Sequence, residues 1–429
     1  MRTTTTGPAE GQGPLRLGPG ARALVVGAGA AGHAAAERLR EDGFTGHLEV
    51  VGGEIHRPYN RTPLTKQLLT GDLVPSDLTL TAFTRLDATF HLGVPATALD
   101  TAQQVLTLAD GRRMDYDGLV LAPGVAARTL PGAPVPSERV RTLRTLADAV
   151  AVERSMSHTT DRVAIVGGGF IGCEVASTAR RRGLAATIID RSPTLLHHGL
   201  GSYLGEVTEQ LHTSHGVRLN MGVGVATWET HDRGVRIRLS DGEVIDADMA
   251  VVGIGTDPQL GWLHGSGLQH DELGQGGIAA AATCHALDTD GRPLDTVVVA
   301  GDAARWPNLR FDTIPRRVEH WINAIEMGQA AATSLLTGPA TATPFTPTPR
   351  FWSQQHGVKI QSAGMPALGD TTTVIAGTLT RRRFLTAYTR HTPDGPVLVG
   401  LIAFDHTQAL NEATPLIGRL VTTGQAVPA

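Results

Sequence analysis

The chain has 429 residues, a net charge of −4 at pH 7 and only two cysteines, Cys173 and Cys284. The length allows two or three domains, and the charge gives no reason to expect nucleic acid as a partner. The two distant cysteines exclude a disulfide framework and a C-x-x-C dithiol. No apolar run approaches the ~18 residues of a membrane span. Residues 1–20 lack the apolar core of a signal peptide, so we expect a disordered tail and a cytoplasmic protein.

The stretch VVGAGAAG, which ends at Gly32, predicts a nucleotide-binding turn. Ala23–Val26 is apolar enough for a buried parallel strand, and Ala34–Leu39 is expected as a helix. Between them Gly27, Gly29 and Gly32 form G-x-G-x-x-G. These glycines allow a tight turn, a close approach of the backbone to a diphosphate, and close packing of helix on strand. The diphosphate then binds at the helix N-terminus, whose N–H groups and dipole favour anions.

The next stretch predicts the ribose-binding part of this unit. His47–Val51 is expected as its second strand, and an acid near the end of such a strand binds the adenosine ribose. Glu54 is the nearest candidate, whereas Glu49 is expected to be a solvated residue at the sheet edge. Pro63 can open a short helix, and Lys66 is expected on it.

The sequence after Lys66 predicts further strands and a helix that leads to the second glycine motif. Val94–Asp117 alternates apolar and polar residues and predicts a small antiparallel meander, followed by a buried strand at Leu119–Leu121. The Pro-rich stretch Pro131–Pro136 is a candidate domain boundary. Thr145–Met156 is expected as a helix that leads into a second glycine motif.

The second motif, VAIVGGGFIG, repeats G-x-G-x-x-G at Gly167, Gly169 and Gly172. The two motifs lie far enough apart to leave room for a domain between them, so the pair predicts two dinucleotides. Ala186–Ile189 is expected as the next strand, and Asp190 stands at its end. A carboxylate there accepts from both ribose hydroxyls and repels a 2′-phosphate, which favours NADH over NADPH, although the adjacent arginine weakens that argument.

The rest of the chain completes an α/β pattern. Val217–Val252 predicts a second meander that leads to a turn ending at Gly255. The β-branched strand Thr296–Ala300 is followed by Asp302, where doubly wound sheets bind ligands, although an ordinary turn aspartate would look the same. The expected later elements are a helix at Glu319–Leu336, a linker at Pro339–Pro349, strands near Val358–Gln361, Thr372–Ala376, Phe384–Tyr388 and Val397–Ile402, and a helix near Gln408–Leu420.

One histidine cluster is the sole candidate for a metal site. It consists of His197, His198, His212 and His215. No cysteine or carboxylate accompanies these residues at ligand spacing, so we expect them to be solvated and we expect no metal.

Several longer motifs resemble one enzyme family. They are GAGAAG (Gly27–Gly32), RPYNRTPLTKQLL (Arg57–Leu69), DGLVLAPG (Asp117–Gly124), LRTLADA (Leu143–Ala149), VGGGFIGCEVA (Val166–Ala176), VAGDAAR (Val299–Arg305), VEHWINAIEMGQAAA (Val318–Ala332) and FWSQQHGVKIQSAG (Phe351–Gly364). Nearly the whole chain resembles the FAD-dependent, NADH-using ferredoxin reductases of bacterial oxygenase systems, of the putidaredoxin and rubredoxin reductase type. These reductases belong to the pyridine nucleotide–disulfide oxidoreductase superfamily.

The resemblance implies an α/β fold with two doubly wound Rossmann-like nucleotide-binding domains and a C-terminal α+β domain. An FAD-binding domain at 21–128 and 249–340 is expected to be split by an inserted NAD-binding domain at 129–248. The C-terminal domain is expected at 346–429.

The resemblance also implies which residues meet the cofactors. For FAD they are Gly27, Gly29, Ala31, Gly32, Arg61, Lys66, Ala96, Gly124, Arg144, Asp302 and Trp321. Glu54 either substitutes for the family's usual acid at the adenosine ribose, or that contact is weakened. For NADH they are Gly167, Gly169, Phe170, Gly172, Glu174, Asp190 and Gly255. Lys66 and Glu174 are the expected catalytic residues: Lys66 near flavin N5 or O4, and Glu174 beside the nicotinamide and flavin. Phe170 is expected to stack there. The alternative interpretations are that Lys66 is a lysine on the surface of a helix and that Glu174 only complements the dipole of its helix.

The chain departs from the family pattern at four places. The usual acid after the second strand is Gly53, the usual R-P-P-L-S-K is RTPLTK, the usual A-T-G is A-P-G at Gly124, and the usual glutamine before Gly328 is Met327. None of these changes removes a catalytic group. They suggest a diverged member with its own protein partner.

The expected function is hydride transfer from NADH to FAD, followed by single-electron transfer to a ferredoxin-type iron–sulfur protein that serves an oxygenase. An acidic ferredoxin could dock at Arg316 and Arg317, extended by Arg381–Arg383, although such arginines are as often only solvated. Trp352 covers the flavin in one interpretation and belongs to domain core in another. Two functional alternatives stay open, namely reduction of a quinone, small molecule or oxygen, and redox sensing by an NADH-bound flavoprotein. The oligomeric state stays open too.

Overall fold

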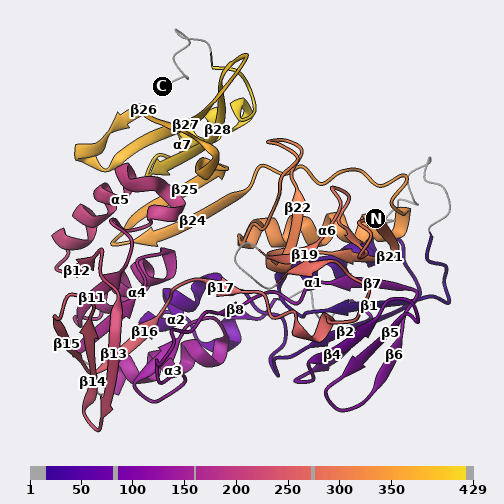
Figure 1. Cartoon of the computed structure of the whole chain (residues 1–429), viewed down its shortest axis with the longest axis horizontal. Coiled ribbons are helices and arrows are strands. Elements are labelled where there is room, and N and C mark those ends of the chain that lie inside the picture. The colour runs from indigo at the N-terminus through magenta and orange to yellow at the C-terminus, as the bar shows by residue number, and fades with distance from the viewer. Residues whose placement is uncertain (1–15, 81–85, 159–160, 272–275, 422–429) are drawn as a thin grey trace, which may run out of the picture. The chain divides into compact units, whose positions relative to one another are not determined.

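A computed structural model describes residues 16–80, 86–158, 161–271 and 276–421 of the chain (Figure 1). The chain forms two compact units. Unit 1 contains residues 1–59, 79–125 and 258–347, and unit 2 contains residues 60–78, 126–257 and 348–429. Each unit is described by itself. In the described residues no helix is both long and apolar enough to cross a membrane.

Unit 1 is built on a six-stranded sheet in the order β20-β21-β7-β1-β2-β3. All neighbouring strands are parallel except β20, which pairs antiparallel with β21. The helices α1 and α6 pack on each other and both contact β7. The elements are β1 (Arg22–Val26), α1 (Ala30–Glu41), β2 (His47–Gly52), β3 (Thr89–Leu92), β7 (Gly118–Leu121), β20 (His285–Leu287), β21 (Pro293–Val299) and α6 (Trp321–Thr337).

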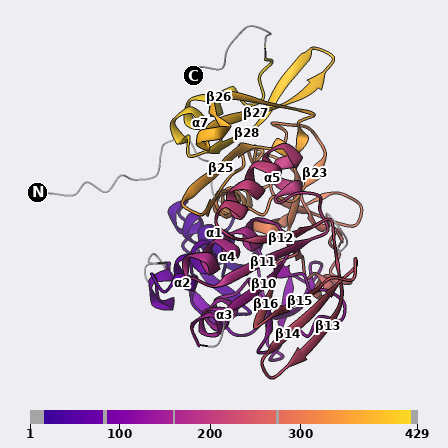
Figure 2. The ribbon, with the colours of Figure 1, turned by 90° about the vertical axis from the view of Figure 1, so that its left-hand side faces the viewer.

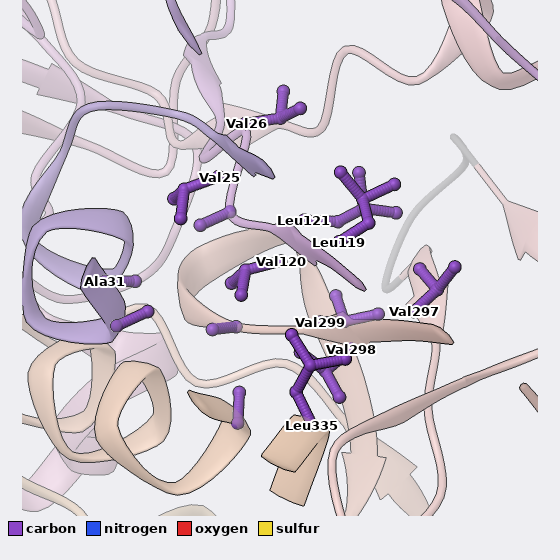
Figure 3. Close-up of a cluster of buried hydrophobic side chains, with 14 of the residues drawn as sticks. Val25, Val26, Ala31, Leu119, Val120, Leu121, Val297, Val298, Val299 and Leu335 are labelled. Atoms are coloured by element: carbon purple, nitrogen blue, oxygen red, sulfur yellow. The ribbon is translucent and has the colours of Figure 1, made fainter. Parts of the chain in front are cut away.

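The core of unit 1 follows from the composition of these strands. Val25, Val120 and Val298 lie on adjacent strands and are fully buried, and Leu335 of α6 belongs to the same core (Figure 3). Parallel strands that are buried on both faces of a sheet have continuous aliphatic sequences, which is why β1, β7 and β21 are easy to identify in the sequence. Leu17, which belongs to the predicted tail at residues 1–20, is buried in this core too. Residues 1–15 lie outside the described part.

Two smaller sheets complete unit 1. The predicted meander at 94–117 is confirmed as an antiparallel sheet, and a four-stranded sheet has the order β18-β19-β22-β23. Their strands are β4 (Ala96–Asp100), β5 (Val105–Leu108), β6 (Arg113–Asp115), β18 (His270–Asp271), β19 (Gly277–Ala279), β22 (Ala304–Pro307) and β23 (Pro315–Arg316); two short 3-10 helices are η4 (Gly261–Leu263) and η5 (Gly301–Ala303).

Unit 2 repeats the doubly wound plan. Its five-stranded sheet is parallel throughout in the order β12-β11-β10-β16-β9, as the strand labels in Figure 2 show for β12, β11, β10 and β16. The predicted second meander is confirmed as the antiparallel sheet β13-β14-β15. The elements are β9 (Val140–Thr142), α3 (Leu146–His158), β10 (Arg162–Val166), α4 (Phe170–Arg181), β11 (Ala185–Asp190), α5 (His197–Ser214), β12 (Arg218–Met221), β13 (Val225–His231), β14 (Gly234–Leu239), β15 (Val244–Ala247) and β16 (Met249–Val252).

The C-terminal part of unit 2 is an antiparallel five-stranded sheet in the order β24-β25-β28-β27-β26 (Figure 1). The four predicted strands are confirmed as β25 to β28, but β24 went unpredicted. The predicted helix near 408–420 ends at Ala413 and continues only as a 3-10 turn. The elements are β24 (Arg350–Gln355), β25 (Val358–Gly364), η6 (Pro366–Leu368), β26 (Thr371–Thr378), η7 (Leu379–Arg381), β27 (Arg383–Thr392), β28 (Gly395–Phe404), α7 (Thr407–Ala413) and η8 (Thr414–Leu416).

A short segment between the two parts of unit 1 belongs to unit 2. Residues 60–78 carry η1 (Thr62–Thr65), α2 (Gln67–Thr70) and η2 (Pro75–Leu78), and α2 packs on α3 and α4. The sequence places this segment in the FAD-binding domain, whereas the structure groups it with α4. The remaining short strands of unit 2 are β8 (Ala126–Ala127) and β17 (Thr256–Asp257), which pair with each other.

Two further sequence-based predictions, for Glu49 and Lys66, are wrong in detail. Glu49 is not at a sheet edge, because β2 lies between β1 and β3, and its carboxylate is 2.7 Å from the ring Nε2 of His91. Lys66 is not within a helix, because it stands between η1 and α2 with φ −125° and ψ −95°. The linker predicted at 339–349 contains a boundary between the two units, after Pro347. Within unit 1 the N–H of Phe345 donates to the carbonyl of Ala282 at 2.7 Å.

Candidate functional site

The first glycine motif forms a cradle at the N-terminus of α1. Gly27 has φ +106°, which glycine adopts without strain, and a Cβ on Gly27 or Gly32 would overlap backbone atoms of the motif or of β7's end. A Cβ on Gly29 would meet no atom of the described chain within 4 Å. Gly29 is also the N-cap of α1 and makes no side-chain capping bond. The open position and the uncapped N–H groups fit the diphosphate of FAD, with Ala31 in the first helical turn.

Other predicted FAD residues of unit 1 lie at the same edge of its sheet. Gly27, Gly124 and Asp302 follow the C-terminal ends of the parallel strands β1, β7 and β21, and such ends meet at one edge. Gly124 has φ +70°. Glu54 follows the neighbouring strand β2, and its carboxylate accepts a hydrogen bond of 2.7 Å from the hydroxyl of Tyr59.

Two more predicted FAD residues lie on other elements of unit 1. Trp321 begins α6 and is half-buried against the core, while Ala96 begins β4. Ala31 is packed between two glycines, since a Cβ on Gly301 or on Gly328 would overlap it or approach it too closely. Close packing of α1 on α6 therefore depends on Gly328 and brings the start of α6 towards the first motif.

The second glycine motif has the same geometry in unit 2. Gly167 has φ +117°, and a Cβ on Gly167 or Gly172 would overlap backbone oxygens, whereas a Cβ on Gly169 would meet no atom of the described chain within 4 Å. Gly169 is the N-cap of α4, again with no side-chain capping bond. The two motifs are therefore matched cradles at the ends of parallel strands in two separate sheets, which fits one dinucleotide in each.

Asp190 ends β11 beside the second cradle. Its two carboxylate oxygens accept hydrogen bonds from the backbone N–H of Gly168 at 2.5 Å and of Ser192 at 2.6 Å. The carboxylate thus fixes the glycine turn and stands where a ribose is bound in this kind of fold. Arg191 is exposed. Gly255, the last predicted NAD residue, has φ +100° and accepts a bond of 2.9 Å from the N–H of Arg128.

The two predicted catalytic residues are paired within unit 2. The Nζ of Lys66 lies 2.7 Å from Oε2 of Glu174, and both side chains are largely buried, at 15% and 7% exposed. Glu174 is the fifth residue of α4, just beyond its first turn, and Lys66 stands at the junction of η1 and α2. This burial does not fit the alternative interpretations, in which Lys66 is a surface lysine and Glu174 only complements the dipole of its helix.

Hydroxyl groups complete the surroundings of Glu174. Thr65 donates to Oε2 of Glu174, and Ser353 of β24 donates to Oε1 at 2.7 Å. The Nζ of Lys66 lies 3.2 Å from the hydroxyl of Thr65. Sequence reasoning missed Thr65 and Ser353, although both lie in motifs that carry the family resemblance. Their sequence separation from Glu174 gave no sign of contact.

Aromatic and arginine side chains of unit 2 also meet. The ring of Phe170, at the start of α4, lies 4.7 Å from the ring of Phe351 in an edge-to-face arrangement. Arg61 donates to the backbone carbonyl of Arg144 at 3.0 Å, so two residues predicted at the FAD lie together. Trp352 is 37% exposed, so it is not ordinary domain core.

The cysteines do not form a redox pair. Cys173 and Cys284 are both free and buried. Burial raises the pKa of the Cys173 thiol well above its usual value and that of Cys284 to about 12. Because the thiolate is the reactive form, neither cysteine is suited to pass electrons near neutral pH.

Arg317 of the predicted cation patch and His212 of the histidine cluster differ from expectation. The side chain of Arg317 is only 4% exposed and pairs with Glu319 at 2.5 Å, so it is not a solvated docking residue. Arg316 pairs with Asp312 at 2.6 Å. His212 is fully buried rather than solvated, because α5 turns it inward. Among the described residues no group of three or more potential ligands could hold a metal ion.

Known proteins resemble this chain over most of its length. It is 34% identical over 359 residues to rhodocoxin reductase of Rhodococcus erythropolis, covering 81% of this chain and 79% of that protein. It is 35% identical over 360 residues to the ferredoxin reductase component of the chlorobenzene dioxygenase of Cupriavidus sp. (strain PS12), covering 83% of each. The crystal structure of the covalent putidaredoxin reductase–putidaredoxin complex matches with a TM-score of 0.82 at 27% identity, covering 92% of this chain and 93% of that one.

The family assignment follows from three comparisons that agree. The pyridine nucleotide-disulphide oxidoreductase family matches residues 21–328, a range that contains both glycine cradles and the Lys66–Glu174 pair. With this match, the sequence relatives and the fold, the chain belongs to the pyridine nucleotide-disulphide oxidoreductase family.

Proposed function

We infer that the protein is an FAD-dependent oxidoreductase that takes a hydride from NADH and passes single electrons to a ferredoxin-type iron–sulfur protein serving an oxygenase. Two of its relatives are named rhodocoxin reductase and the ferredoxin reductase component of chlorobenzene dioxygenase. The observation that carries the inference is the pair of matched cradles in a chain whose two cysteines are free and buried. Electrons that reach the flavin therefore leave to another molecule rather than to a dithiol of the same chain.

The chain's own residues bind and orient the cofactors. Bound FAD supplies the step from two-electron to one-electron chemistry. We propose that the cradle at Gly29 and the sheet edge at Asp302 hold FAD, and that the cradle at Gly169 and Asp190 hold NADH. A carboxylate at the ribose position favours NADH, because it repels a 2′-phosphate.

We propose that Lys66 and Glu174 are the catalytic pair. A buried ammonium stabilises negative charge that develops on a reduced flavin, and charges in a site that excludes water act more strongly than in water. Glu174 keeps Lys66 in place through the 2.7 Å contact and limits its motion. Phe170, held edge-to-face by Phe351, offers a ring face for a nicotinamide.

The partner is a ferredoxin, and we propose that it presents an acidic surface. Arg316 is the more accessible residue of the predicted pair, at 27% exposed, since Arg317 is buried. Arg381 and Arg383 are exposed on unit 2. Arg316→Glu and Arg381→Glu tested separately should each raise the KM for ferredoxin at low salt, and the difference should shrink at high salt if charge attraction is the cause. A cytoplasmic location stays a prediction.

Anaerobic stopped-flow tests the function. NADH, and NADPH in a separate run, are mixed with the FAD-loaded protein, and putidaredoxin, cytochrome c or oxygen is added as acceptor. Fast bleaching of the flavin by NADH with turnover that depends on the iron–sulfur protein is the expected result. Reoxidation by oxygen or a quinone at the same rate without ferredoxin contradicts it. Protein that binds no flavin after reconstitution contradicts the proposed cradle.

A further inference from the structure

A chain of hydrogen bonds runs from Glu174 to a pair of histidines within unit 2. Ser353 donates to Oε1 of Glu174 at 2.7 Å, and the side-chain amide of Gln355 donates to the Ser353 hydroxyl at 3.0 Å. Nε2 of His212 lies 3.0 Å from the Gln355 carbonyl oxygen, and Nε2 of His356 lies 3.1 Å from Nδ1 of His212. This hydrogen-bond chain connects α4, β24 and α5.

The inner members of this chain are shielded from water. Gln355 and His212 are 0% exposed and Ser353 is 1% exposed. In such surroundings a polar group that points the wrong way loses its partner without gaining water, which costs free energy. Each member must therefore match the hydrogen-bonding role of its neighbours.

The carboxylate end decides the direction of every bond. Because the Glu174 carboxylate only accepts, Ser353 must donate to it and accept from the Gln355 amide. The Gln355 carbonyl then faces His212, so His212 must carry its proton on Nε2. Neutral His212 accepts at Nδ1, so His356 must also carry its proton on Nε2. The two tautomers are thus set by a carboxylate several groups away.

The charge state of the histidines agrees with this direction. Burial lowers the pKa of His212 to about 4. Burial and the neighbouring His212 and His215 lower the pKa of His356 to about 3. The ring of His215 stacks on that of His356 with centroids 4.3 Å apart. Both linked rings are neutral near pH 7, as the chain of donors and acceptors requires.

The far end of the chain returns to the helix that carries Glu174. The backbone N–H of His356 donates to the hydroxyl of Ser177 on α4 at 2.7 Å. On the same helix, Thr178 donates to the backbone carbonyl of Thr65 at 2.9 Å. The hydrogen-bond chain therefore meets α4 at both ends, at Glu174 and at Ser177 about one turn later.

We propose that Ser353, Gln355 and His212 are positioning residues for Glu174, which hold its carboxylate so that one oxygen faces Lys66 while the other is occupied by Ser353. This proposal rests on the proposed catalytic role of the Lys66–Glu174 pair. The outermost link is His356, whose Nε2 donates to Nδ1 of His212 and so completes the hydrogen-bond chain.

The first test reads the histidine tautomers directly. In Glu174→Gln the new amide must turn its carbonyl to Lys66, which only donates, and its NH₂ to Ser353. Ser353 then accepts from the new amide and donates to the Gln355 carbonyl, so the Gln355 NH₂ turns towards His212. His212 must accept this bond at Nε2, and its proton therefore moves from Nε2 to Nδ1. Histidine ¹⁵N NMR on the purified flavoprotein measures this, with the His212 signals assigned from His212→Gln. Glu206→Gln, an exposed change on α5, is the control and should leave the tautomer as it is. An Nδ1–H tautomer of His212 in the wild type, or no change in Glu174→Gln, overturns the proposal.

The second test separates the two bonds of His212. A glutamine amide reaches the place of the imidazole Nε2, and an asparagine amide reaches only the place of Nδ1. His212→Gln therefore keeps the link to Gln355, and His212→Asn loses it. We expect kcat of His212→Asn to fall by about three- to tenfold with the KM for NADH little changed, and His212→Gln to stay closer to wild type. Equal kcat values for two variants of equal thermal midpoint overturn the proposal.

The experiments distinguish a failure of the positioning proposal from a failure of the proposed function. If Glu174→Gln flips the tautomer but flavin reduction by NADH keeps its rate, the hydrogen-bonded chain stands and the catalytic role of Glu174 fails. If Glu174→Gln slows reduction but the His212 tautomer does not change, the catalytic role stands and the positioning chain fails.

Discussion

The ammonium of Lys66 and the carboxylate of Glu174 lie 2.7 Å apart, although 108 positions separate them in the chain. Both belong to unit 2, where η1 and α2 pack against α4. Because the pair is largely buried, each charge depends on the other for compensation.

Replacing Lys66 should slow the reaction without removing the flavin. We expect Lys66→Met to reduce the rate of flavin reduction by NADH by about 100-fold, since one fixed positive charge at a developing anion is worth about that much. In a double-mutant cycle with Glu174→Gln, the two changes should be non-additive by about 1–3 kcal/mol. Stopped-flow rates give the cycle. Additive effects would mean that the two side chains act independently.

The two cradles can be separated by matched glycine substitutions. A Cβ at Gly29 or Gly169 meets no described protein atom within 4 Å, so Gly29→Ala and Gly169→Ala should fold. Gly29→Ala should weaken FAD binding, and Gly169→Ala should keep FAD but raise the Kd for NADH, because the methyl group stands where a diphosphate approaches the backbone.

Gly32→Ala and Gly172→Ala are the controls for the glycine experiment. A Cβ at either position overlaps a backbone oxygen, so these variants should lose stability whether or not a dinucleotide is present. Thermal unfolding, flavin absorbance and NADH titration report the three properties. Loss of NADH binding in Gly29→Ala with retention of FAD would reverse the assignment of the cradles.

Asp190 should control the choice between NADH and NADPH. Asp190→Ala removes the charge that repels a 2′-phosphate and leaves the exposed Arg191 beside the site, so the NADPH to NADH ratio of kcat/KM should rise by about 10-fold or more. Stability should fall as well, because the carboxylate accepts from the N–H groups of Gly168 and Ser192. Arg191→Ala is the counterpart and should lower any residual use of NADPH. Steady-state kinetics with both nucleotides would disprove the role of Asp190 by showing an unchanged ratio.

Mild acid should destabilise the protein through its buried histidines. Burial lowers the pKa of His212, His285 and His320 to about 4 each. The unfolded chain binds these protons below about pH 6.5 while the folded protein does not, so stability is lost as pH falls from about 6.5 towards 4. Each group contributes up to about 1.4 kcal/mol per pH unit in this window.

Urea unfolding between pH 7.5 and 4.5 measures this dependence on pH. His212→Gln should make the fall shallower, because one of the contributing groups no longer titrates. An equally steep fall in that variant would show that His212 does not take part.

The strands and glycine turns were predictable because their causes are local. Aliphatic runs such as Ala23–Val26 are buried on both faces. Gly27 is required by its φ of +106°, and Gly32 by the overlap that a Cβ would make with the carbonyl oxygen of Gly27 in the same turn. The position of Asp190 follows from its place at the end of β11. The sequence did not predict β24, because its residues show no clear alternation of apolar and polar side chains.

The sequence by itself determined the doubly wound fold, the two nucleotide cradles and the family, since these depend on short-range patterns of glycine and aliphatic residues. Only the tertiary structure decided that Thr65 and Ser353 hold Glu174, that His212 is buried, and that Arg317 is paired with Glu319. Such contacts depend on which side chains of distant segments meet in a water-poor interior, where each polar group takes whatever partner the packing leaves within reach.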